Sequence, residues 1–352
     1  MNNKIYEQYL REKDIYTIFG EKIKILVKDL MDINGINYQS ITYRTKDEKS
    51  LLNKLERKKY KYKDLKEITD ISGIRIITYY SDSVDKVAKI ISEQFEVDTE
   101  NTIDKRKALD PDRFGYLSLH YVVSLKNNRL NLPEYNMFKD LKLEIQIRSI
   151  SQHTWAEIEH DLGYKSEIGV PKGIRRDFYR LAGLLELVDK EFIEIRDKLE
   201  SYKKDLEIKI REDKEDVLID EVSLTLYIDF SKNIKKLNEK IYESINGTFI
   251  STSDLIESTV KELKWIGFQT IKDIDIEIEK NKEGIYNLAK NILKDSESKQ
   301  ISTEVSLLYL CYYKLCESDS IDKLNKFIKE NGFEPNYDFS KKLISIYKEF
   351  KK

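Results

Sequence analysis

Residues that could carry chemistry gather in two strand-like stretches of this chain, YLSLHYVVSL (116–125) and LKLEIQIRS (141–149). In both, apolar residues alternate with polar ones, and successive side chains of a strand point to opposite faces. Each stretch therefore predicts a strand with one apolar face and one face of hydrogen-bonding groups. The polar positions offer two hydroxyls, an imidazole, a carboxylate, an amide and a guanidinium: Tyr116, Ser118, His120, Glu144, Gln146 and Arg148. Such a face is either ordinary wetted surface or the floor of a site.

A helix-like stretch, SQHTWAEIEHDL, follows the second strand. Its residues His153, Glu157 and His160 are spaced i, i+4 and i+7, which places them on one helical face. The chain has only three histidines, and all fall between positions 120 and 160. This concentration favours a functional site over a solvated surface. Zinc is an alternative ligand, but the pattern is not HExxH and lacks a clear third ligand.

A basic stretch, YRTKDEKSLLNKLERKK, lies upstream of both strands. Its residues Ser50, Lys54 and Lys58 are four apart and form one stripe of a predicted helix, while Arg44 and Lys46 precede that helix as an extended pair. Converging cations suit a polyphosphate, which demands positive charge and hydrogen-bond donors. The alternative is an ordinary lysine-bearing helix surface. Neither a P-loop sequence nor a GxGxxG turn occurs, so the predicted phosphate site is of neither kind.

Acidic residues complete the candidate set. Asp70 stands just before the predicted strand 72–80, which also carries Arg75. Magnesium is commonly held by one or two carboxylates together with phosphate oxygens, so Asp70 and Glu144 are candidate Mg²⁺ ligands. Two acids, a metal and a triphosphate predict group transfer onto a hydroxyl. One acid would bind the metal, and the other would share it or accept the hydroxyl proton.

The elements that must position these residues alternate between helix and strand. We expect helices at 3–33, 47–63, 82–95 and 151–162, and strands at 72–80, 116–125 and 141–149. This interleaving predicts an α+β fold with a helix-flanked mixed sheet. No convincing strand follows residue 172, where one long helix or a helical pair and then several amphipathic helices are expected. We therefore predict a first domain at 1–210 and an all-helical C-terminal domain at 211–352.

The composition narrows the class of protein. The 352 residues include 36% charged residues, yet the net charge is only −2, which argues against a general nucleic-acid coat protein. No apolar run approaches the roughly 18 residues needed to span a bilayer, and the N-terminus has no signal-peptide core. Cys311 and Cys316 have no Cys or His partners nearby and are expected to be reduced core thiols. A cytoplasmic protein without a membrane partner is therefore expected.

Taken together, these motifs resemble the synthetase domain of the RelA/SpoT family, the (p)ppGpp synthetases, over about residues 40–170. The matching pieces follow one another in the family's order: Arg44-x-Lys46 with Ser50, Lys54 and Lys58; Asp70-x-x-Gly73-x-Arg75; Gly115-Tyr116-x-Ser118-x-His120; Glu144-Ile145-Gln146-Ile147-Arg148; and His153-x-Trp155-Ala156-Glu157 followed by His160 and Tyr164-Lys165. The resemblance does not extend to the C-terminal half.

The resemblance implies a nucleotidyltransferase-like fold and transfer of pyrophosphate from ATP to the 3′-hydroxyl of GDP or GTP, with Mg²⁺. It implies these roles: Arg44, Lys46, Ser50, Lys54, Lys58 and Arg75 bind ATP; Asp70 and Glu144 are the catalytic and metal-binding acids; Tyr116, Ser118, His120, Gln146 and Arg148 bind the acceptor; and His153 and Glu157 support them. No hydrolase motif of the bifunctional relatives is apparent, so we expect synthesis only.

One departure concerns the acceptor loop. Family members that use GDP or GTP usually carry Pro-Lys-x-Asn-Gly-Tyr, whereas this chain has Pro111-Asp112-Arg113-Phe114-Gly115-Tyr116. The loop therefore lacks the lysine that would meet the acceptor phosphates and the asparagine that would read guanine. The alternative is an enzyme like the toxic small alarmone synthetases, acting on the tRNA 3′ end or on adenine nucleotides, with the C-terminal part as substrate platform, regulator or built-in antitoxin. A catalytically dead nucleotide-binding regulator is a third alternative, against which both acids argue. Association into a homo-oligomer through the helices stays open.

Overall fold

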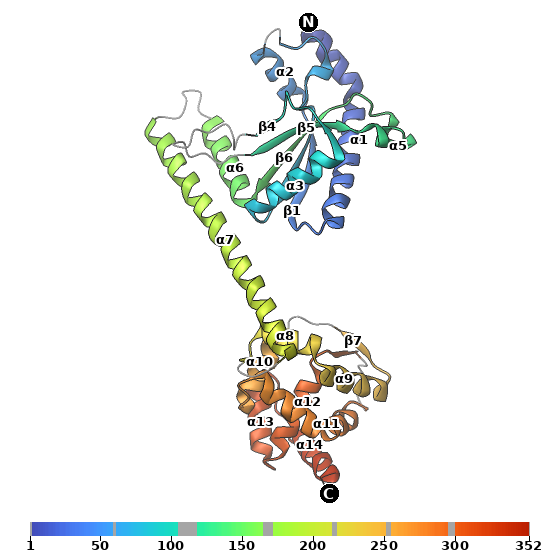
Figure 1. The fold of residues 1–352 in the computed structure, drawn as a ribbon, viewed down its shortest axis with the longest axis vertical. Helices are drawn as coiled ribbons and strands as arrows, with labels where there is room; N and C mark the ends of the chain where they lie inside the picture. The colour runs from blue at the N-terminus through green and yellow to red at the C-terminus, as the bar shows by residue number, and fades with distance from the viewer. Residues whose placement is uncertain are drawn as a thin grey trace. The chain divides into compact units, whose positions relative to one another are not determined.

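The computed structural model describes residues 2–58, 61–104, 118–164, 172–212, 217–250, 255–294 and 300–351. Tyr116 and the rest of the loop 111–116 lie outside these ranges, so the predictions made for that loop have no structural counterpart. The chain divides into two compact units, Met1–Asp197 and Lys198–Lys352 (Figure 1). The predicted domain limit at residue 210 lies further along the helix in which this division falls, and it stays a prediction.

The first unit is built on a mixed sheet, as the sequence predicted. Its strands are β1 (Tyr38–Thr45), β2 (Ser72–Thr78), β3 (Phe95–Val97), β4 (Ile103–Asp104), β5 (Leu119–Leu125) and β6 (Leu143–Ser149). The strand order is β1-β2-β6-β5-β3, with β4 also paired to β5. Strands β2 and β6 are parallel, and the other pairs are antiparallel. Only β2, β5 and β6 were expected as strands. At β1 the sequence had indicated no more than an extended pair, Arg44 and Lys46, of which Arg44 lies in the strand and Lys46 directly after it.

Helices α1 (Asn2–Ile33) and α3 (Ser81–Gln94) cover the apolar face of this sheet (Figure 1). Along α1, Tyr9, Phe19 and Ile23 are fully buried at helical spacings. They pack in one cluster with the alternate residues of β2 and β6, such as Ile74 and Ile145, which are also buried. The smaller elements of this unit are α2 (Glu48–Arg57), the 3-10 turn η1 (Leu65–Glu67), α4 (Asn127–Leu130) and α5 (Pro133–Asn136).

Strand β6 continues into helix α6 (Ile150–Tyr164) without a loop. Ser149 forms the junction, because its backbone N–H donates to Gln152 Oε1 at 2.9 Å and its Oγ accepts from the Gln152 N–H at 3.2 Å. This reciprocal pair is a capping box, which fixes the start of a helix. The Ser149 hydroxyl also donates to the buried carboxylate of Asp189 at 2.8 Å. These bonds hold α6 at the end of the sheet, where it packs against β2 and β6.

Asp189 belongs to α7 (Lys172–Glu212), which is one continuous helix of 41 residues where the sequence had left one helix or two. In the first unit, α7 packs through Ala182 and Asp189, both buried. It also contacts α3, since Arg196 Nη1 lies 3.0 Å from the Asp82 carboxylate. These contacts make the N-terminal part of α7 an integral helix of the first unit.

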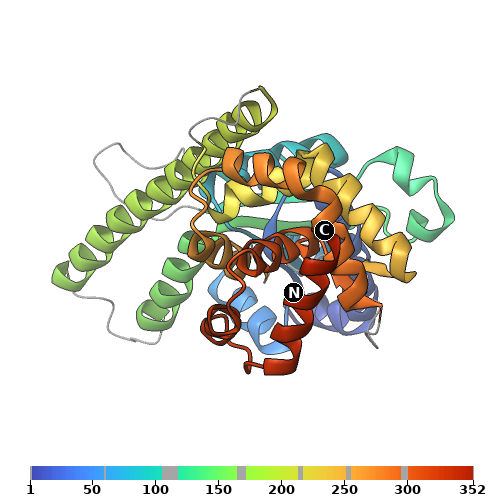
Figure 2. The ribbon, with the colours of Figure 1, turned by 90° about the horizontal axis from the view of Figure 1, so that it is seen from below.

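The second unit is helical, as predicted, with α8 (Glu221–Phe230), α9 (Lys232–Ile245), α10 (Ile256–Ile266), α11 (Ile271–Leu293), α12 (Val305–Cys316), α13 (Ile321–Glu330) and α14 (Tyr337–Phe350). The last two of these, in red, lie against each other in Figure 2. The prediction of an all-helical unit is corrected at one point, because β7 (Thr248–Ile250) and β8 (Gln300–Ser302) form a short parallel pair. Both cysteines are free and buried in α12. Among the described residues, no helix is long and apolar enough to cross a bilayer.

Candidate active site

The register of the sheet brings the polar positions of four strands together on one face. Arg75 of β2 pairs with Gln146 of β6, which pairs in turn with His120 of β5. One step along, Arg44 of β1 pairs with Gly73, and Gly73 pairs with Glu144. Residues paired across neighbouring strands point to the same face. The alternation in the sequence therefore places these side chains on the face opposite the apolar cluster.

Glu144 is the most strongly held acid of this face. His120 Nδ1 lies 2.9 Å from Glu144 Oε1, and Gln146 Nε2 donates to Oε2 at 2.7 Å. Burial alone would raise the pKa of Glu144, but the hydrogen bond and charge of His120, the Gln146 amide and the nearby Arg44 outweigh it and lower the pKa to about 2. An ionised carboxylate can only accept, which assigns the proton on this side of the ring to His120 Nδ1. The other ring nitrogen, Nε2, lies 2.6 Å from Ser118 Oγ.

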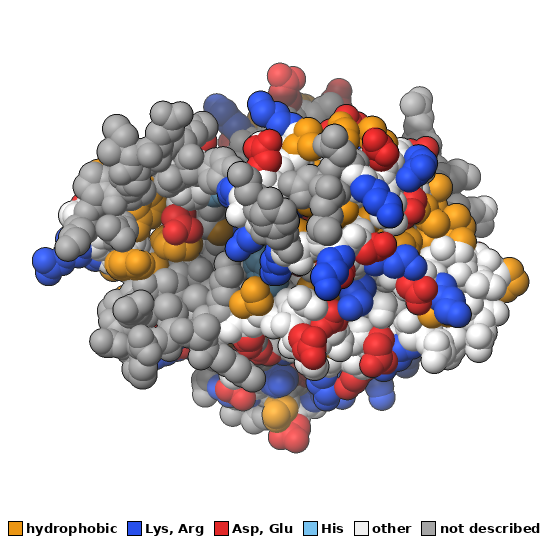
Figure 3. Space-filling model, turned by 90° about the horizontal axis from the view of Figure 1, so that it is seen from above, with side chains coloured by type: hydrophobic (Ala, Val, Ile, Leu, Met, Phe, Trp, Pro, Cys, Tyr) orange, Lys and Arg blue, Asp and Glu red, His pale blue; other side chains and the backbone are white. Residues whose placement is uncertain are grey.

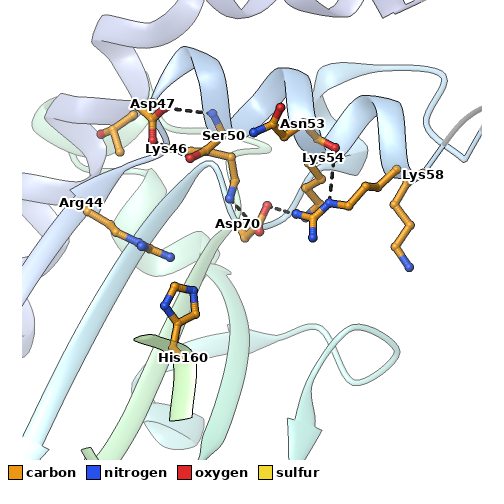
Figure 4. Close-up of a pocket in the computed structure, with 11 residues that line it drawn as sticks. Arg44, Lys46, Asp47, Ser50, Asn53, Lys54, Lys58, Asp70 and His160 are labelled. Carbon is orange, nitrogen blue, oxygen red and sulfur yellow. Dashed lines mark hydrogen bonds and ion pairs between the residues drawn. The ribbon is translucent and has the colours of Figure 1, made fainter. Parts of the chain in front are cut away.

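A cavity of about 830 Å³ opens beside this row, between β1, α2 and α6 (Figure 4). Its walls are predominantly cationic and polar, and they comprise Arg44, Thr45, Lys46, Asp47, Ser50, Asn53, Lys54, Arg57, Lys58, Asp70 and His160. The structure thus brings together five of the six residues predicted to bind ATP. The sixth, Arg75, lies on the same sheet face but does not line this cavity.

Asp70 is the centre of the ion pairs in the cavity. One carboxylate oxygen lies 2.7 Å from Lys54 Nζ, and the other lies 3.1 Å from Lys46 Nζ (Figure 4). All three side chains are partly shielded from solvent, with exposed fractions of 13% for Lys46, 21% for Lys54 and 27% for Asp70. The predicted metal ligand and two predicted phosphate-binding lysines therefore pair with one another.

The second acid of the cavity, Asp47, has a different task. It is the N-cap of α2, where its Oδ1 accepts the Ser50 N–H at 2.9 Å and its Oδ2 accepts the Ser50 hydroxyl at 2.6 Å. The first turn of α2 is also held in place by Leu51, which is buried in the apolar cluster of the first unit. Sequence and local structure agree here, since Asp is among the preferred N-cap residues.

Arg148, His153 and Glu157 form a separate group with Arg75. Glu157 Oε1 lies 3.1 Å from Arg75 Nη1, 3.6 Å from His153 Nδ1 and 4.0 Å from Arg148 Nη1. Burial, with the charge of Arg75, lowers the pKa of both Arg148 and His153. The buried Arg148 Nε has no hydrogen-bond partner among the described residues. Arg148, predicted to bind the acceptor, is thus grouped with the residues predicted to support the site.

Five residues of the cavity were not among the predicted site residues: Thr45, Asp47, Asn53, Arg57 and His160. Asn53 and Arg57 lie three and seven residues after Ser50, so helical spacing from Ser50 could have found them. His160 was recognised as part of a helical face, but its approach to the cavity depends on the direction in which α6 leaves the sheet. Figure 4 shows its ring facing Arg44 and Asp70 from the opposite wall.

The described acids fit a metal ion that arrives with a nucleotide better than a preformed metal centre. Among the described residues, no group of three or more His, Cys, Asp or Glu side chains is arranged to hold a metal ion. Magnesium needs only one or two carboxylates when phosphate oxygens and water supply the rest, and Asp70 lines the cavity that would hold those phosphates.

The surface around the first unit is of mixed charge. On the face seen in Figure 3, Lys and Arg side chains are interspersed with Asp and Glu side chains. The cavity, in contrast, is lined by five Lys and Arg side chains and two Asp side chains.

Comparison with known proteins gives matches to about half of this chain or less. The family model described as "Region found in RelA / SpoT proteins" matches residues 43–169. The GTP pyrophosphokinase YwaC of Bacillus subtilis is 30% identical over 179 residues, which cover 50% of this chain and 82% of YwaC. The GTP pyrophosphokinase YjbM of the same organism is 26% identical over 202 residues, 56% of this chain and 90% of YjbM. The crystal structure of small alarmone synthetase 1 from Bacillus subtilis matches with a TM-score of 0.46 and 25% identity, over 55% of this chain and 99% of that one.

Proposed function

Because this chain belongs to the RelA/SpoT family, we propose that it is a pyrophosphokinase that transfers pyrophosphate from ATP to the 3′-hydroxyl of GDP or GTP, giving (p)ppGpp. Both curated relatives described above are named GTP pyrophosphokinase, and the chain spans most of the length of each. The activity would reside in the first unit, since the family match ends at residue 169.

One observation carries the proposal most directly. A cationic cavity sized for a nucleoside triphosphate lies beside the half-buried carboxylate of Glu144, which is ionised at neutral pH. Arg44 contributes to both, because it lines the cavity and helps to lower the pKa of Glu144. A donor held by its phosphates in the cavity would therefore present its β-phosphorus toward the end of the sheet where Glu144 stands.

The proposed reaction forms one bond and breaks one. The acceptor 3′-oxygen bonds to the β-phosphorus of ATP, the bond from that phosphorus to the oxygen bridging to the α-phosphate breaks, and AMP leaves. Glu144 would accept the hydrogen bond of the 3′-hydroxyl and take its proton as the new bond forms. A carboxylate with a pKa of about 2 is a weak base. Phosphoryl transfer passes through a loose transition state, so alignment of the nucleophile matters more than base strength.

The remaining charged residues would serve the donor. Lys46, Lys54 and Lys58 would neutralise the phosphates, with Ser50 as a hydrogen-bond donor, and Arg44 and Arg75 would hold the adenine. Bound Mg²⁺ would neutralise charge on the transferred group, with Asp70 as its ligand from this chain and Glu144 as a possible second. His120 and Gln146 would keep the Glu144 carboxylate in place, as their hydrogen bonds to it do already.

The sequence of the acceptor loop favours a second candidate. Asp112 and Phe114 replace a lysine and an asparagine of the family pattern, so free GDP or GTP would lose one phosphate contact and one base contact. The same chemistry on the tRNA 3′ end or on an adenine nucleotide would not need those contacts. In that case the second unit would act as substrate platform, regulator or antitoxin.

A labelling experiment separates the two. The full chain is incubated with γ-³²P-ATP and Mg²⁺ and, in turn, with GDP, GTP, ATP and bulk tRNA. Label on GDP or GTP supports the first proposal, and label confined to tRNA or to an adenine nucleotide supports the second. Retention of ATP binding with no transfer to any acceptor would contradict both.

A further inference from the structure

The two lysines that contact Asp70 differ from the other cations of the cavity. Lys46 and Lys54 each pair with one Asp70 oxygen, at 3.1 and 2.7 Å. Among the described residues, Arg57 and Lys58 line the same cavity without an ion pair to an acidic side chain. Asp70 thus neutralises Lys46 and Lys54 but not Arg57 or Lys58. It does so in a place where screening of charge by solvent is reduced.

This pairing has opposite consequences for two forms of the same nucleotide. A metal-free triphosphate must break both ion pairs and then lie next to the unpaired Asp70 carboxylate, which repels it. A metal-complexed triphosphate offers Asp70 a cation in exchange for the lysines. Lys46 and Lys54 are then released to bind the phosphate oxygens, and no carboxylate is left unpaired.

We propose that Asp70 is a specificity-determining residue that makes the phosphate cavity selective for metal-complexed over metal-free nucleotide. The inference rests on the proposed function, since it takes the cavity as the ATP site. It goes further in stating that the lysines become available only when Asp70 finds another cation. Because coupling between two ligands is reciprocal, nucleotide must raise the affinity of the site for the metal by the same factor.

The direction of the metal effect is itself informative. A cavity that attracted phosphates by positive charge alone would bind metal-free ATP, with its higher negative charge, more tightly than the magnesium complex. The pairing of Asp70 predicts the reverse for the wild-type protein. Without the Asp70 charge, the cavity should again bind metal-free ATP more tightly than the magnesium complex.

The test is an equilibrium binding measurement on the full chain by titration calorimetry. The probe is α,β-methylene-ATP, in which the bond that would break is replaced, with either Mg²⁺ or EDTA present. For wild type we expect Mg²⁺ to tighten binding, on the order of 5- to 150-fold. In Asp70→Asn, metal-free binding should become tighter than in wild type, and the Mg²⁺ advantage should vanish or invert.

Asp47→Asn is the matched control. It removes one negative charge from the same cavity, but Asp47 binds Ser50 rather than a lysine, and Asn caps a helix about as well as Asp. This variant should shift both affinities in the same direction and keep the wild-type Mg²⁺ preference. An Asp70→Asn preference equal to that of wild type, or an Asp47→Asn variant that loses the preference equally, would overturn the inference.

A second pair of variants reports on the lysines themselves. Lys54→Gln should weaken binding of the magnesium complex strongly and metal-free binding little, because Lys54 is held by Asp70 in the absence of metal. Lys58→Gln should weaken both alike. Equal effects of Lys54→Gln on the two forms would contradict the inference.

These measurements do not depend on turnover. If the wild-type protein transfers pyrophosphate to no acceptor but shows the predicted metal preference, the proposed function fails and the Asp70 inference stands. If transfer occurs but Asp70→Asn leaves the preference unchanged, the inference fails alone.

Discussion

Two glutamates, the half-buried Glu144 of the first unit and the buried Glu262 of the second, show opposite behaviour. Glu144 of β6 has a pKa lowered to about 2, because His120, Gln146 and Arg44 together outweigh the effect of burial. Glu262 of α10 is 6% exposed, and burial alone raises its pKa to about 7. The same side chain is thus held charged in one unit and driven toward neutrality in the other. The difference teaches that neighbours, more than depth, decide whether a buried carboxylate keeps its charge.

The surroundings of Glu262 are correspondingly apolar. Burial and the nearby Glu262 raise the pKa of the Cys311 thiol, and they raise the pKa of Tyr312 to about 12. In the first unit, the charge of the half-buried Glu144 is stabilised by hydrogen bonds from His120 and Gln146. Such an arrangement is expected of a site that binds a ligand and reacts with it. For Glu262 burial is the cause of the raised pKa, no hydrogen-bonding partner is found among the described residues, and its charge costs stability.

The largest expected effect comes from removing the negative charge of Glu144. Glu144→Gln should lower pyrophosphate transfer about 10²- to 10⁴-fold, because a neutral amide cannot accept the hydroxyl proton. The nearly isosteric change should leave circular dichroism and Trp155 fluorescence unaltered. Glu96→Gln, at an exposed position on β3 of the same sheet, is the control and should retain activity. Full activity in Glu144→Gln would refute the catalytic role.

The buried carboxyl group of Glu262 should make the unfolding free energy depend on pH. The folded-state pKa of Glu262 lies above its ordinary value of 4.5, so its charge penalises folding increasingly between pH 4.5 and 7 and fully above that range. The shift corresponds to about 3 kcal/mol. The difference in unfolding free energy between Glu262→Gln and wild type should therefore grow by about that amount from pH 4.5 to pH 8.5.

Denaturant titrations in a Trp155→Phe background would isolate this effect, since Trp265 lies on α10 itself and then supplies the only tryptophan signal. Glu257→Gln is the control on the same helix, where the carboxylate is exposed and paired with Lys261. It should change stability little. A pH-independent effect of Glu262→Gln would show that its carboxyl does not titrate on folding.

A smaller effect on the transfer rate should come from removing one hydrogen-bonding partner of Glu144. His120→Ala removes a hydrogen bond to a charged group, which is worth about 10- to 100-fold in transfer. It should also move the acid limb of the pH–rate profile upward, toward pH 4.5, because the pKa of Glu144 rises when His120 is lost. His120→Asn keeps a donor near Nδ1 and should restore part of both. Identical profiles for the two variants would leave His120 with a packing role only.

The smallest effect is expected for an acid that has partners but little burial. The Glu157 side chain is 52% exposed, although it lies near Arg75 and His153. Glu157→Gln should change the unfolding free energy by less than about 1 kcal/mol, as measured by denaturant titration of Trp155 fluorescence in a Trp265→Phe background. A larger loss would mean that partners alone, without burial, suffice to make an acid structurally important.

The sequence was a good guide wherever the signal is local. The alternation around Glu144 and His120 predicted β5, β6 and their polar face, and the helix predicted at 47–63 is α2, which ends earlier, at Arg57. The pairing of Lys46 and Lys54 with Asp70 could not be read in advance, because it needs the register of β1 against β2. The strands β7 and β8 have three residues each and too short a pattern to detect. Glu262 looks like an ordinary surface residue of an amphipathic helix, and only the packing of α10 against α12 makes it buried.

The loop-free junction at Ser149 has a consequence for how this chain can vary. Ser149 ends β6, caps α6 and binds Asp189. The number of residues between Glu144 and Ile150, which is five, therefore fixes the rotation of α6 about its axis relative to the sheet. An inserted residue at this point would rotate His153, Glu157 and His160 by about 100° around the helix axis while Glu144 stayed in the sheet. We therefore expect insertion scanning to find this segment intolerant of length change, even at positions where substitutions are harmless.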